Sequence, residues 1–251
     1  MRVLIVHAHP EPASFNSAMT RRATDVLTDA GHQVTVSDLY AIGFDPVSDR
    51  RNFQSVANAQ FLRLQNEEEH ASACNGFVPA LQAEMDKLLG CDLLIFQFPI
   101  WWLGPPAILK GWIDRVFAVG RAYGGGRYFD EGVLAGKRAM CSVTVGGPRD
   151  VYSGKGVYAE VEDILFPIHR GLFAFTGFLV IEPFVVYAPN RMDQAERQRN
   201  LDRYGQYLLN LDAARTIPSP KIADFDGGIL RPAQRAESAS VKLSGARPED
   251  R

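Results

Sequence analysis

Short runs of β-favouring apolar residues alternate with helix-favouring segments along the chain, and this alternation most strongly limits the folds open to it. The runs lie at residues 3–7, 34–37, 92–98, 138–145 and 178–187. The clearest helical segments between them are residues 17–30, 79–89 and 105–119. Strands that alternate with helices build a parallel sheet covered on both faces. We therefore predict an α/β fold with a doubly wound sheet of five parallel strands, in the order 2-1-3-4-5 and with helices on both faces.

Two of the predicted elements contain a proline, which limits how regular they can be. Residues 157–173 have helical spacing, but Pro167 should kink or divide that helix. The run at 178–187 contains Pro183, which predicts the edge of a sheet or a bulge. Residues 193–214 read as a charged amphipathic helix, and residues 41–78 as loops with short helices.

The composition changes at residue 215, where large apolar residues become few. We predict one catalytic domain over residues 1–214 and a C-terminal extension over residues 215–251. The extension is rich in Pro, Ser, Ala, Gly and alternating charge. Such a tail is either loosely held or packed on the body of the protein or on a partner subunit.

Charge and hydropathy exclude several classes of partner. Lys plus Arg number 27 and Asp plus Glu 29, so the net charge of −2 predicts neither nucleic acid nor anionic membrane as a partner. Residues 93–109 are uncharged, but they are short for a span and interrupted by prolines, so we expect a buried strand and loop without membrane insertion. The N-terminus lacks secretory features, and three cysteines without a CxxC pair favour a reducing cytoplasm.

Three loops that follow predicted strands carry unusual residues. They span residues 9–16, 99–105 and 146–152. In doubly wound sheets, ligands bind beyond the carboxyl ends of the strands, where the strand order reverses. Because these loops follow strands 1, 3 and 4, we expect them to meet around one ligand.

Each loop contributes a different chemistry. The first leads into a helix N-terminus, which favours an anion such as phosphate, and Ser14 or Asn16 can add a hydrogen bond or simply cap the helix. The second carries Trp101 and Trp102, which either pack in the core or flank a planar aromatic ring. In the third, paired glycines allow the main chain to approach a flat ligand closely. A phosphate-bearing tail and a flat ring together indicate a flavin nucleotide.

The chain resembles the flavin-dependent NAD(P)H:quinone oxidoreductases, the DT-diaphorase type of the flavodoxin-like superfamily. The matching segments are HPEPASFN, SDLYAIGFDP, FQFPIWWLGPPAILKGWIDRVF, VTVGG and FTGFLVIEP, in the same order over roughly residues 2 to 200. The resemblance implies a flavodoxin-like fold, a bound FAD rather than FMN, and NAD(P)H as co-substrate. It also implies a homodimer with active sites at the subunit interface, acting on a quinone or another small aromatic acceptor.

The resemblance further implies roles for individual residues. Residues that would hold the diphosphate, the ribityl chain and the adenosine part are His9, Ser14, Phe15, Asn16, Gln60 and Arg197. Residues that would line the isoalloxazine ring are Pro99, Ile100, Trp101, Trp102, Leu103, Thr144, Val145, Gly146, Gly147 and Tyr152. Residues that would wall the substrate pocket, partly from the other subunit, are Trp102, Tyr123, Tyr128, Gly146 and Phe175. Gly125 stands where some members carry an aromatic residue, so this pocket is expected to be wider.

The family's mechanism is ping-pong, with hydride transfer from NAD(P)H to flavin N5 and then to the quinone. A tyrosine and a histidine six residues later are credited with stabilising negative charge on the reduced ring. Tyr152 matches the tyrosine, but Tyr158 stands in place of the histidine. A phenol donates a hydrogen bond yet does not become cationic near neutral pH, so we expect reduction with an altered rate and pH dependence.

Several alternatives remain open from the sequence. His7 and His9 share a strand face and could form a metal pair, although no ligand-spaced partner supports this, and we predict no metal site. His169 is expected to be structural, and residues 154–159 fit GxGxxA without the preceding strand that a dinucleotide site needs. The functional alternatives are an azo or nitro reductase with the same cofactor, and a flavin-bound regulatory subunit of a potassium efflux system.

Overall fold

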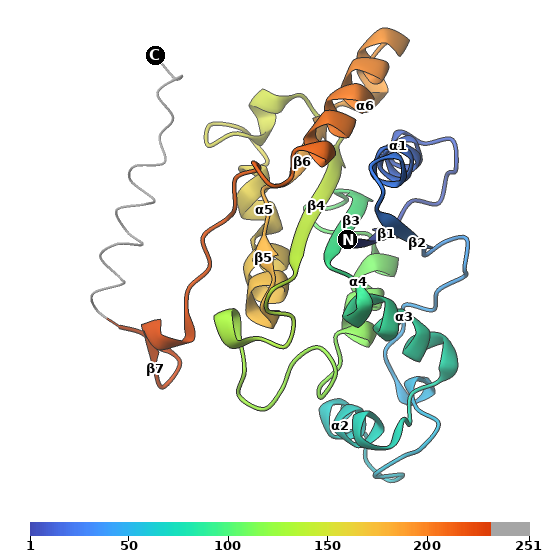
Figure 1. The fold of residues 1–251 in the computed structure, drawn as a ribbon, viewed down its shortest axis with the longest axis vertical. Helices are drawn as coiled ribbons and strands as arrows, with labels where there is room; N and C mark the ends of the chain where they lie inside the picture. Colours follow the sequence, from blue (N-terminus) through green and yellow to red (C-terminus); the bar gives the residue numbers. More distant parts are fainter. Residues whose placement is uncertain (232–251) are drawn as a thin grey trace.

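A twisted parallel sheet forms the middle layer of the computed structural model, which describes residues 1–231 (Figure 1). Its strands are β1 (Arg2–His7), β2 (Gln33–Asp38), β3 (Leu93–Pro99), β4 (Arg138–Val145), β5 (Leu179–Val180) and β6 (Phe184–Tyr187). The order is β2-β1-β3-β4-β5, with β6 also paired to β4. This confirms the predicted fold class and strand order.

The fifth predicted strand is present in two pieces because Pro183 interrupts it. β5 pairs with Arg138 and Ala139 at the start of β4, and β6 pairs with the last four residues of β4. Proline has no N–H to donate to a neighbouring strand, so the ladder breaks where the sequence places it. The predicted edge or bulge at Pro183 is confirmed.

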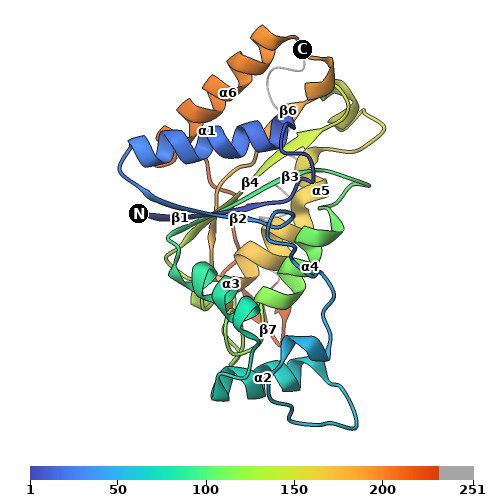
Figure 2. The same ribbon diagram turned by 90° about the vertical axis from the view of Figure 1, so that its right-hand side faces the viewer.

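Helices cover both faces of the sheet (Figure 2). One face carries α1 (Phe15–Asp29) and α6 (Gln194–Leu209). The other carries α3 (Pro79–Gly90), α4 (Ala107–Val116) and α5 (Val161–Ile168), and α2 (Leu64–Cys74) lies beyond them. Ser14 caps α1 by accepting from the Ser17 N–H, and Asp193 and Glu196 form a capping box at α6.

Two predicted helices are shorter than the sequence pattern indicated. The helix predicted over 157–173 begins only at Val161, and after Pro167 the chain changes to a π-helix over His169–Ala174. The division at Pro167 is therefore confirmed, and the start at 157 was wrong. The helix predicted to reach residue 214 ends at Leu209, and the chain continues in turns.

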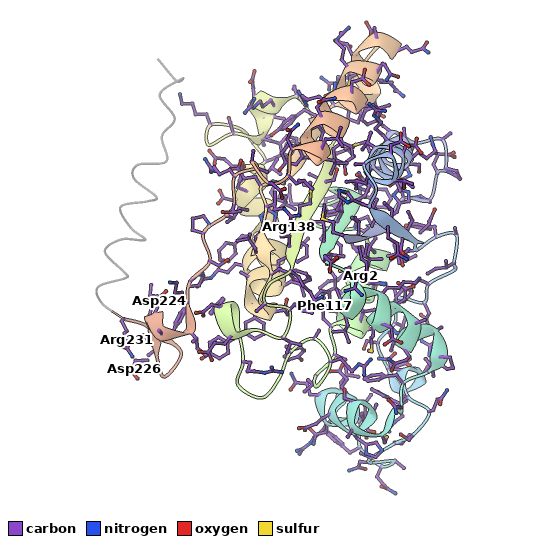
Figure 3. The ribbon with its side chains drawn as sticks, viewed as in Figure 1. Arg2, Phe117, Arg138, Asp224, Asp226 and Arg231 are labelled. Carbon is purple, nitrogen blue, oxygen red and sulfur yellow. The ribbon has the colours of Figure 1, made fainter. Side chains whose placement is uncertain are left out.

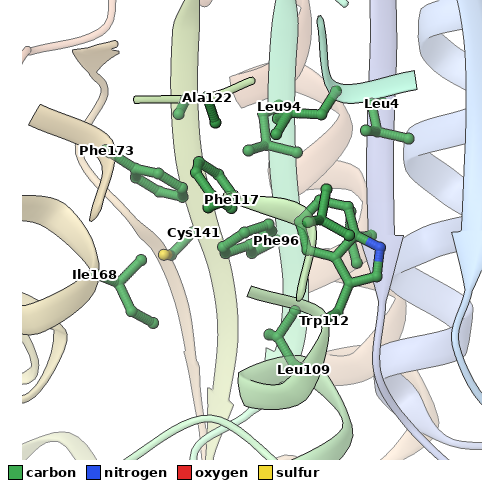
Figure 4. Close-up of a cluster of buried hydrophobic side chains, with 14 of the residues drawn as sticks. Leu4, Leu94, Phe96, Leu109, Trp112, Phe117, Ala122, Cys141, Ile168 and Phe173 are labelled. Atoms are coloured by element: carbon green, nitrogen blue, oxygen red, sulfur yellow. The ribbon is translucent and has the colours of Figure 1, made fainter. Parts of the chain in front are cut away.

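Aromatic side chains fill the core between the sheet and α4 and α5 (Figure 4). The Phe96 ring meets Trp112 edge-on at 5.8 Å between centroids and Phe173 at 5.0 Å. The Trp112 indole N–H donates to Glu84 Oε2 at 2.8 Å, so this buried polar group has a partner. These contacts fix α3 and α4 against the sheet.

Residues 215–231 lie along the β5 side of the sheet and contact it through main-chain hydrogen bonds. The Ile217 N–H donates to the Val180 carbonyl at 2.8 Å. The segment continues into a hairpin of β7 (Phe225–Asp226) and β8 (Ile229–Leu230), where Figure 3 labels Asp224, Asp226 and Arg231. The Phe225 ring stacks on Phe129 at 5.4 Å. The rest of the predicted extension, residues 232–251, lies outside the described residues.

None of the helices in residues 1–231 combines the length and the apolar character that a bilayer crossing requires. The uncharged stretch at 93–109 forms β3, a loop and the first turn of α4. The predicted buried strand followed by an apolar loop is confirmed.

We predict that His169 makes the stability of the fold depend on pH. Burial lowers the pKa of His169 to about 4, and its Nε2 has no partner within the described residues. Between about pH 6.5 and pH 4 the unfolded chain therefore takes up a proton that the folded chain excludes, so stability is full above this window and falls as the pH falls through it. As the pH falls through this window, the free energy of unfolding of the His169→Leu variant should decrease by about 1.4 kcal/mol less per pH unit than that of the parent. Urea unfolding at several pH values measures this, and equal slopes would refute it.

Candidate active site

The loops that follow β1, β3 and β4 meet around one hollow of about 450 Å³ at the carboxyl edge of the sheet, which we call the edge hollow. This volume is in the range of small-molecule and cofactor sites. Its lining consists of His9, Glu11, Ala13, Ser14, Phe15, Asn16, Pro99, Ile100, Trp101, Thr144, Val145, Gly146, Pro189, Asn190 and Arg197. The expected meeting of three distant segments is thus present in the structure.

The N-terminus of α1 opens into the edge hollow and offers hydrogen-bond donors. Ser14, Phe15 and Asn16 all line the hollow, and the Ser14 hydroxyl accepts from the Ser17 N–H at 3.1 Å. Within residues 1–231, the main-chain N–H groups of Phe15 and Asn16 have no hydrogen-bond partner. Free N–H groups at the positive end of a 15-residue helix form a site for an anionic group.

A buried chain of amides ties α1 to β3 and β4 beneath the edge hollow. Asn16 Nδ2 donates to Thr144 Oγ1 at 2.8 Å, and Gln97 Nε2 donates to Asn16 Oδ1 at 2.9 Å. All three side chains are buried. Because each bond joins a different element, the chain fixes how Asn16 and Thr144 face the hollow.

The second loop contains a strained two-residue turn. The Trp101 N–H donates to the Gly104 carbonyl at 2.9 Å, and the Gly104 N–H returns a bond of 3.0 Å. The turn forces Trp102 and Leu103 to φ values of 51° and 54°, which side chains disfavour by about 1–3 kcal/mol each. The Trp102 side chain is wholly exposed, and Trp101 is 43% exposed. Strain and large exposed apolar surface occur together where a ligand or another chain would contact the loop.

The third loop depends on its glycines for two different reasons. A Cβ on Gly146 would meet nothing within 4 Å, so the main chain presents an open approach to the edge hollow. A Cβ on Gly147 would lie 2.7 Å from Val151 and 3.2 Å from the Tyr152 ring, so this glycine lets the loop fold back closely. Tyr152 in turn stacks on Tyr158 with 5.0 Å between ring centroids.

Burial favours the neutral forms of two titratable side chains in these loops, His9 and Tyr152. Burial lowers the pKa of His9, whose Nδ1 accepts from the Glu11 N–H at 3.0 Å. Burial and the neighbouring Tyr158 raise the pKa of Tyr152. Tyr152 therefore keeps its hydroxyl proton and can donate it in a hydrogen bond.

Some predicted site residues lie outside the lining of the edge hollow. Trp102, Leu103, Gly147 and Tyr152 belong to the same loops without lining it, and Tyr158 stands behind Tyr152. Gln60 lies in the loop before α2, where its N–H bonds to the Asn58 side chain at 3.0 Å. The roles predicted for these residues in binding or catalysis therefore stay predictions.

Tyr123, Tyr128 and Phe175 gather in a separate cluster. The rings of Tyr128 and Phe175 stack at 5.9 Å, and Tyr123 meets Phe175 edge-on at 6.2 Å. Tyr123 and Phe175 line a second hollow of about 490 Å³ that shares no lining residue with the edge hollow. Within one chain, the predicted substrate wall therefore stands apart from the predicted cofactor site.

Four lining residues were missed by the sequence reasoning: Glu11, Ala13, Pro189 and Asn190. Glu11 and Ala13 lie within the first predicted loop, and the Glu11 carboxylate accepts from the Ala13 N–H at 2.7 Å. Pro189 and Asn190 follow the carboxyl end of β6. The rule that ligands bind beyond the carboxyl ends of the strands, which located the other three loops, would also have indicated Pro189 and Asn190.

The structure gives His7 and His9 separate partners. The His7 ring contacts the hydroxyls of Ser17 and Thr20, and His9 contacts the Glu11 main chain. Over residues 1–231, no three His, Cys, Asp or Glu side chains gather where they could hold a metal ion. Residues 154–159 form turns and loop, not a strand-to-helix junction.

Comparisons with known proteins agree with this geometry. A family model described as the flavodoxin-like fold matches residues 1–208. The ribosyldihydronicotinamide dehydrogenase-like protein traD of Penicillium crustosum is 43% identical over 92% of each chain. NAD(P)H dehydrogenase [quinone] 1 of Cavia porcellus is 41% identical over 84% of this chain and 77% of its own.

A solved structure gives the same result. A Klebsiella pneumoniae protein proposed to be a quinone reductase superposes with a TM-score of 0.86 at 38% identity, covering 93% of this chain and 92% of its own. The two proteins therefore share their fold over most of both chains.

We predict that Gln97→Leu destabilises the fold by about 1–3 kcal/mol, because it leaves the buried Asn16 Oδ1 without a donor. Gln82→Leu is the matched control, since Gln82 bonds only to Asp86 at the surface of α3, and it should change stability by less than about 0.5 kcal/mol. Urea unfolding measures both. Equal effects of the two substitutions would contradict the structural role of the amide chain.

Proposed function

The chain belongs to the flavodoxin-like family that includes the NAD(P)H quinone dehydrogenases, and we propose that it uses a bound flavin to reduce quinones with NAD(P)H. The observation that carries the proposal is the edge hollow. Free helix N–H groups, an exposed indole and a bare glycine face it from three separate loops.

The residues of the edge hollow fit a flavin nucleotide. The N–H groups of Phe15 and Asn16 suit a phosphate, with His9 and Ser14 beside them. Pro99 to Trp101 and Thr144 to Gly146 line the hollow and suit the flat ring, since an indole face and exposed main chain both pack well against aromatic planes. Trp102, Leu103 and Gly147 lie next to them in the same loops. Arg197 and Asn190 also line the hollow, from outside the three loops. These additional polar groups support FAD over FMN.

When bound, the flavin would accept a hydride from NAD(P)H and deliver it to a quinone in two separate half-reactions. The chain's own groups would bind and orient the flavin and stabilise charge on its ring. Tyr152 would donate a hydrogen bond to negative charge on the bound ring, and Tyr158 stacks on the Tyr152 ring. Neither phenol supplies a positive charge near pH 7.

The same placements support our proposal of a homodimer with shared active sites. Tyr123, Tyr128 and Phe175 form a wall that does not face the edge hollow of their own chain, and Trp102 stands wholly exposed beside that hollow. A second copy would bring one set of features against the other. Gly125 adopts a φ of 63° and carries no side chain, which supports a wide acceptor pocket.

We also propose a cytoplasmic location for the protein, because its three cysteines, Cys74, Cys91 and Cys141, are free.

Steady-state turnover tests the proposal. The purified full chain, supplied with FAD, should oxidise NADH or NADPH only when a simple quinone such as a benzoquinone is present, with one nicotinamide consumed per quinone reduced. The mass of the released flavin separates FAD from FMN. Faster turnover of azo or nitro compounds than of quinones would favour a reductase of those acceptors. Flavin binding without turnover, with a co-purifying channel subunit, would favour the regulatory role.

The azo reductase alternative has weaker support. An FMN-dependent NADH-azoreductase from Bacillus anthracis superposes with a TM-score of 0.61 at 13% identity, a level that shows only a shared fold. No observation in the described residues favours the regulatory alternative.

We predict that Tyr158→His introduces a new pH dependence into flavin reduction by NAD(P)H. An imidazole becomes cationic below about pH 6.5, whereas the phenol stays neutral there. Stopped-flow rates between pH 5.5 and pH 8.5 should be flat in the parent and rise toward low pH in the variant. Leu209→His is the control and should match the parent, because Leu209 is exposed at the C-terminal end of α6, close to Asp212, which pairs with Arg138 at the opposite edge of the sheet. Superimposable profiles of parent and Tyr158→His would contradict the assigned role.

A further inference from the structure

His7 is the last residue of β1, and its buried imidazole bridges the sheet to the first two turns of α1. Its Nε2 lies 3.1 Å from Ser17 Oγ and its Nδ1 lies 2.9 Å from Thr20 Oγ1. Only 2% of the residue is exposed. The mechanism assigned to the edge hollow does not use this side chain, yet Ser17 is in direct contact with Ser14, which lines the hollow.

The surrounding hydrogen bonds determine which ring nitrogen carries the proton. Ser17 Oγ donates its single hydrogen to the Glu11 carbonyl at 2.9 Å. Its contacts with His7 Nε2 and with Ser14 Oγ at 3.0 Å must therefore be bonds that it accepts. Nε2 thus carries the hydrogen, and Nδ1 accepts from the Thr20 hydroxyl. His7 is a neutral imidazole with one donor and one acceptor, both used.

The charge state of His7 agrees with this pattern. Burial lowers the pKa of His7 to about 4, with Asp38 opposing and His9 and Arg21 reinforcing the shift. The neutral form therefore holds throughout the physiological range. A neutral ring adds no positive charge of its own beneath the loop, so its effect on an anion passes through the hydroxyls that it contacts.

We propose that His7 is a positioning residue for phosphate binding: because its Nε2–H donates to Ser17 Oγ, that buried oxygen keeps a donor when the Ser14 hydroxyl hydrogen turns from it to a phosphate oxygen of the flavin nucleotide. This inference rests on the proposed function. Without the imidazole, the Ser17 oxygen has only Ser14 as a donor, and that hydrogen stays committed inside the protein. The flat ring of the flavin contacts the other two loops, so its own binding does not depend on His7.

The comparison of FMN with riboflavin isolates this effect, because the two differ only in the phosphate. Dissociation constants are measured by flavin fluorescence on the full chain freed of bound flavin. In His7→Leu the preference for FMN over riboflavin should fall about tenfold, with riboflavin affinity unchanged. His169→Leu, which replaces another buried histidine away from the site, should keep the preference of the parent.

A double variant separates positioning from general support of the fold. In His7→Leu/Ser17→Ala no serine oxygen competes for the Ser14 hydrogen, so the preference for FMN should recover. Ser17→Ala alone should also keep it, which tests the proposal even if His7→Leu fails to fold. Equal losses of FMN and riboflavin affinity in His7→Leu, no loss of either, or a tenfold loss of preference in Ser17→Ala would overturn the proposal. A parent chain that binds neither flavin would instead refute the proposed function, and the inference with it.

Discussion

The parallel register of β1, β3 and β4 is the constraint on which the rest of the structure depends. His7 pairs with Gln97, and Gln97 pairs with Ser142, so the three strands reach the same edge together. These three polar residues are buried and form a row across the three strands. Because the row is buried, its polar groups favour partners within the protein: His7 contacts Ser17 and Thr20, and Gln97 donates to Asn16, all on α1. The sheet thereby sets where the helix N-terminus points.

The same register explains why strain is tolerated in the second loop. Ile100 continues the ladder by donating to the Thr144 carbonyl at 2.9 Å, and the turn at Trp102 and Leu103 begins directly after it. The loop is anchored at its base, so the positive φ angles persist at its tip. Such strain is retained where it holds a side chain in a functional position, and here it holds an indole in solvent beside the edge hollow.

Most of the sheet could be predicted from the sequence because its strands are near-continuous apolar runs. The bounds of β4 match the prediction, and Pro167 and Pro183 marked the interruptions because proline removes a main-chain donor. The contacts of residues 215–231 could not be predicted, since they depend on Phe225 meeting Phe129, whose φ of 53° is set by the surrounding fold.

The site was predictable at the level of loops and less so at the level of side chains. The rule that ligands bind beyond the carboxyl ends of the strands located the loops containing His9, Trp101 and Gly146 without any knowledge of contacts. His7 illustrates the limit: its spacing from His9 left open a metal pair that we did not predict, and its partners Ser17 and Thr20 become visible only once α1 is placed on the sheet. The separation of Tyr123 from the edge hollow likewise depends on tertiary structure, which spacing does not encode.

Tryptophan fluorescence during FAD titration tests the central claim most directly, because two of the three tryptophans lie in the second loop and the third, Trp112, is buried in the core. The account predicts saturation at one FAD per chain and strong quenching that is lost in Trp101→Phe/Trp102→Phe, whose remaining emission from Trp112 responds far less. Absence of stoichiometric binding, or equal fractional quenching in the double variant, would contradict a flavin site at the edge hollow.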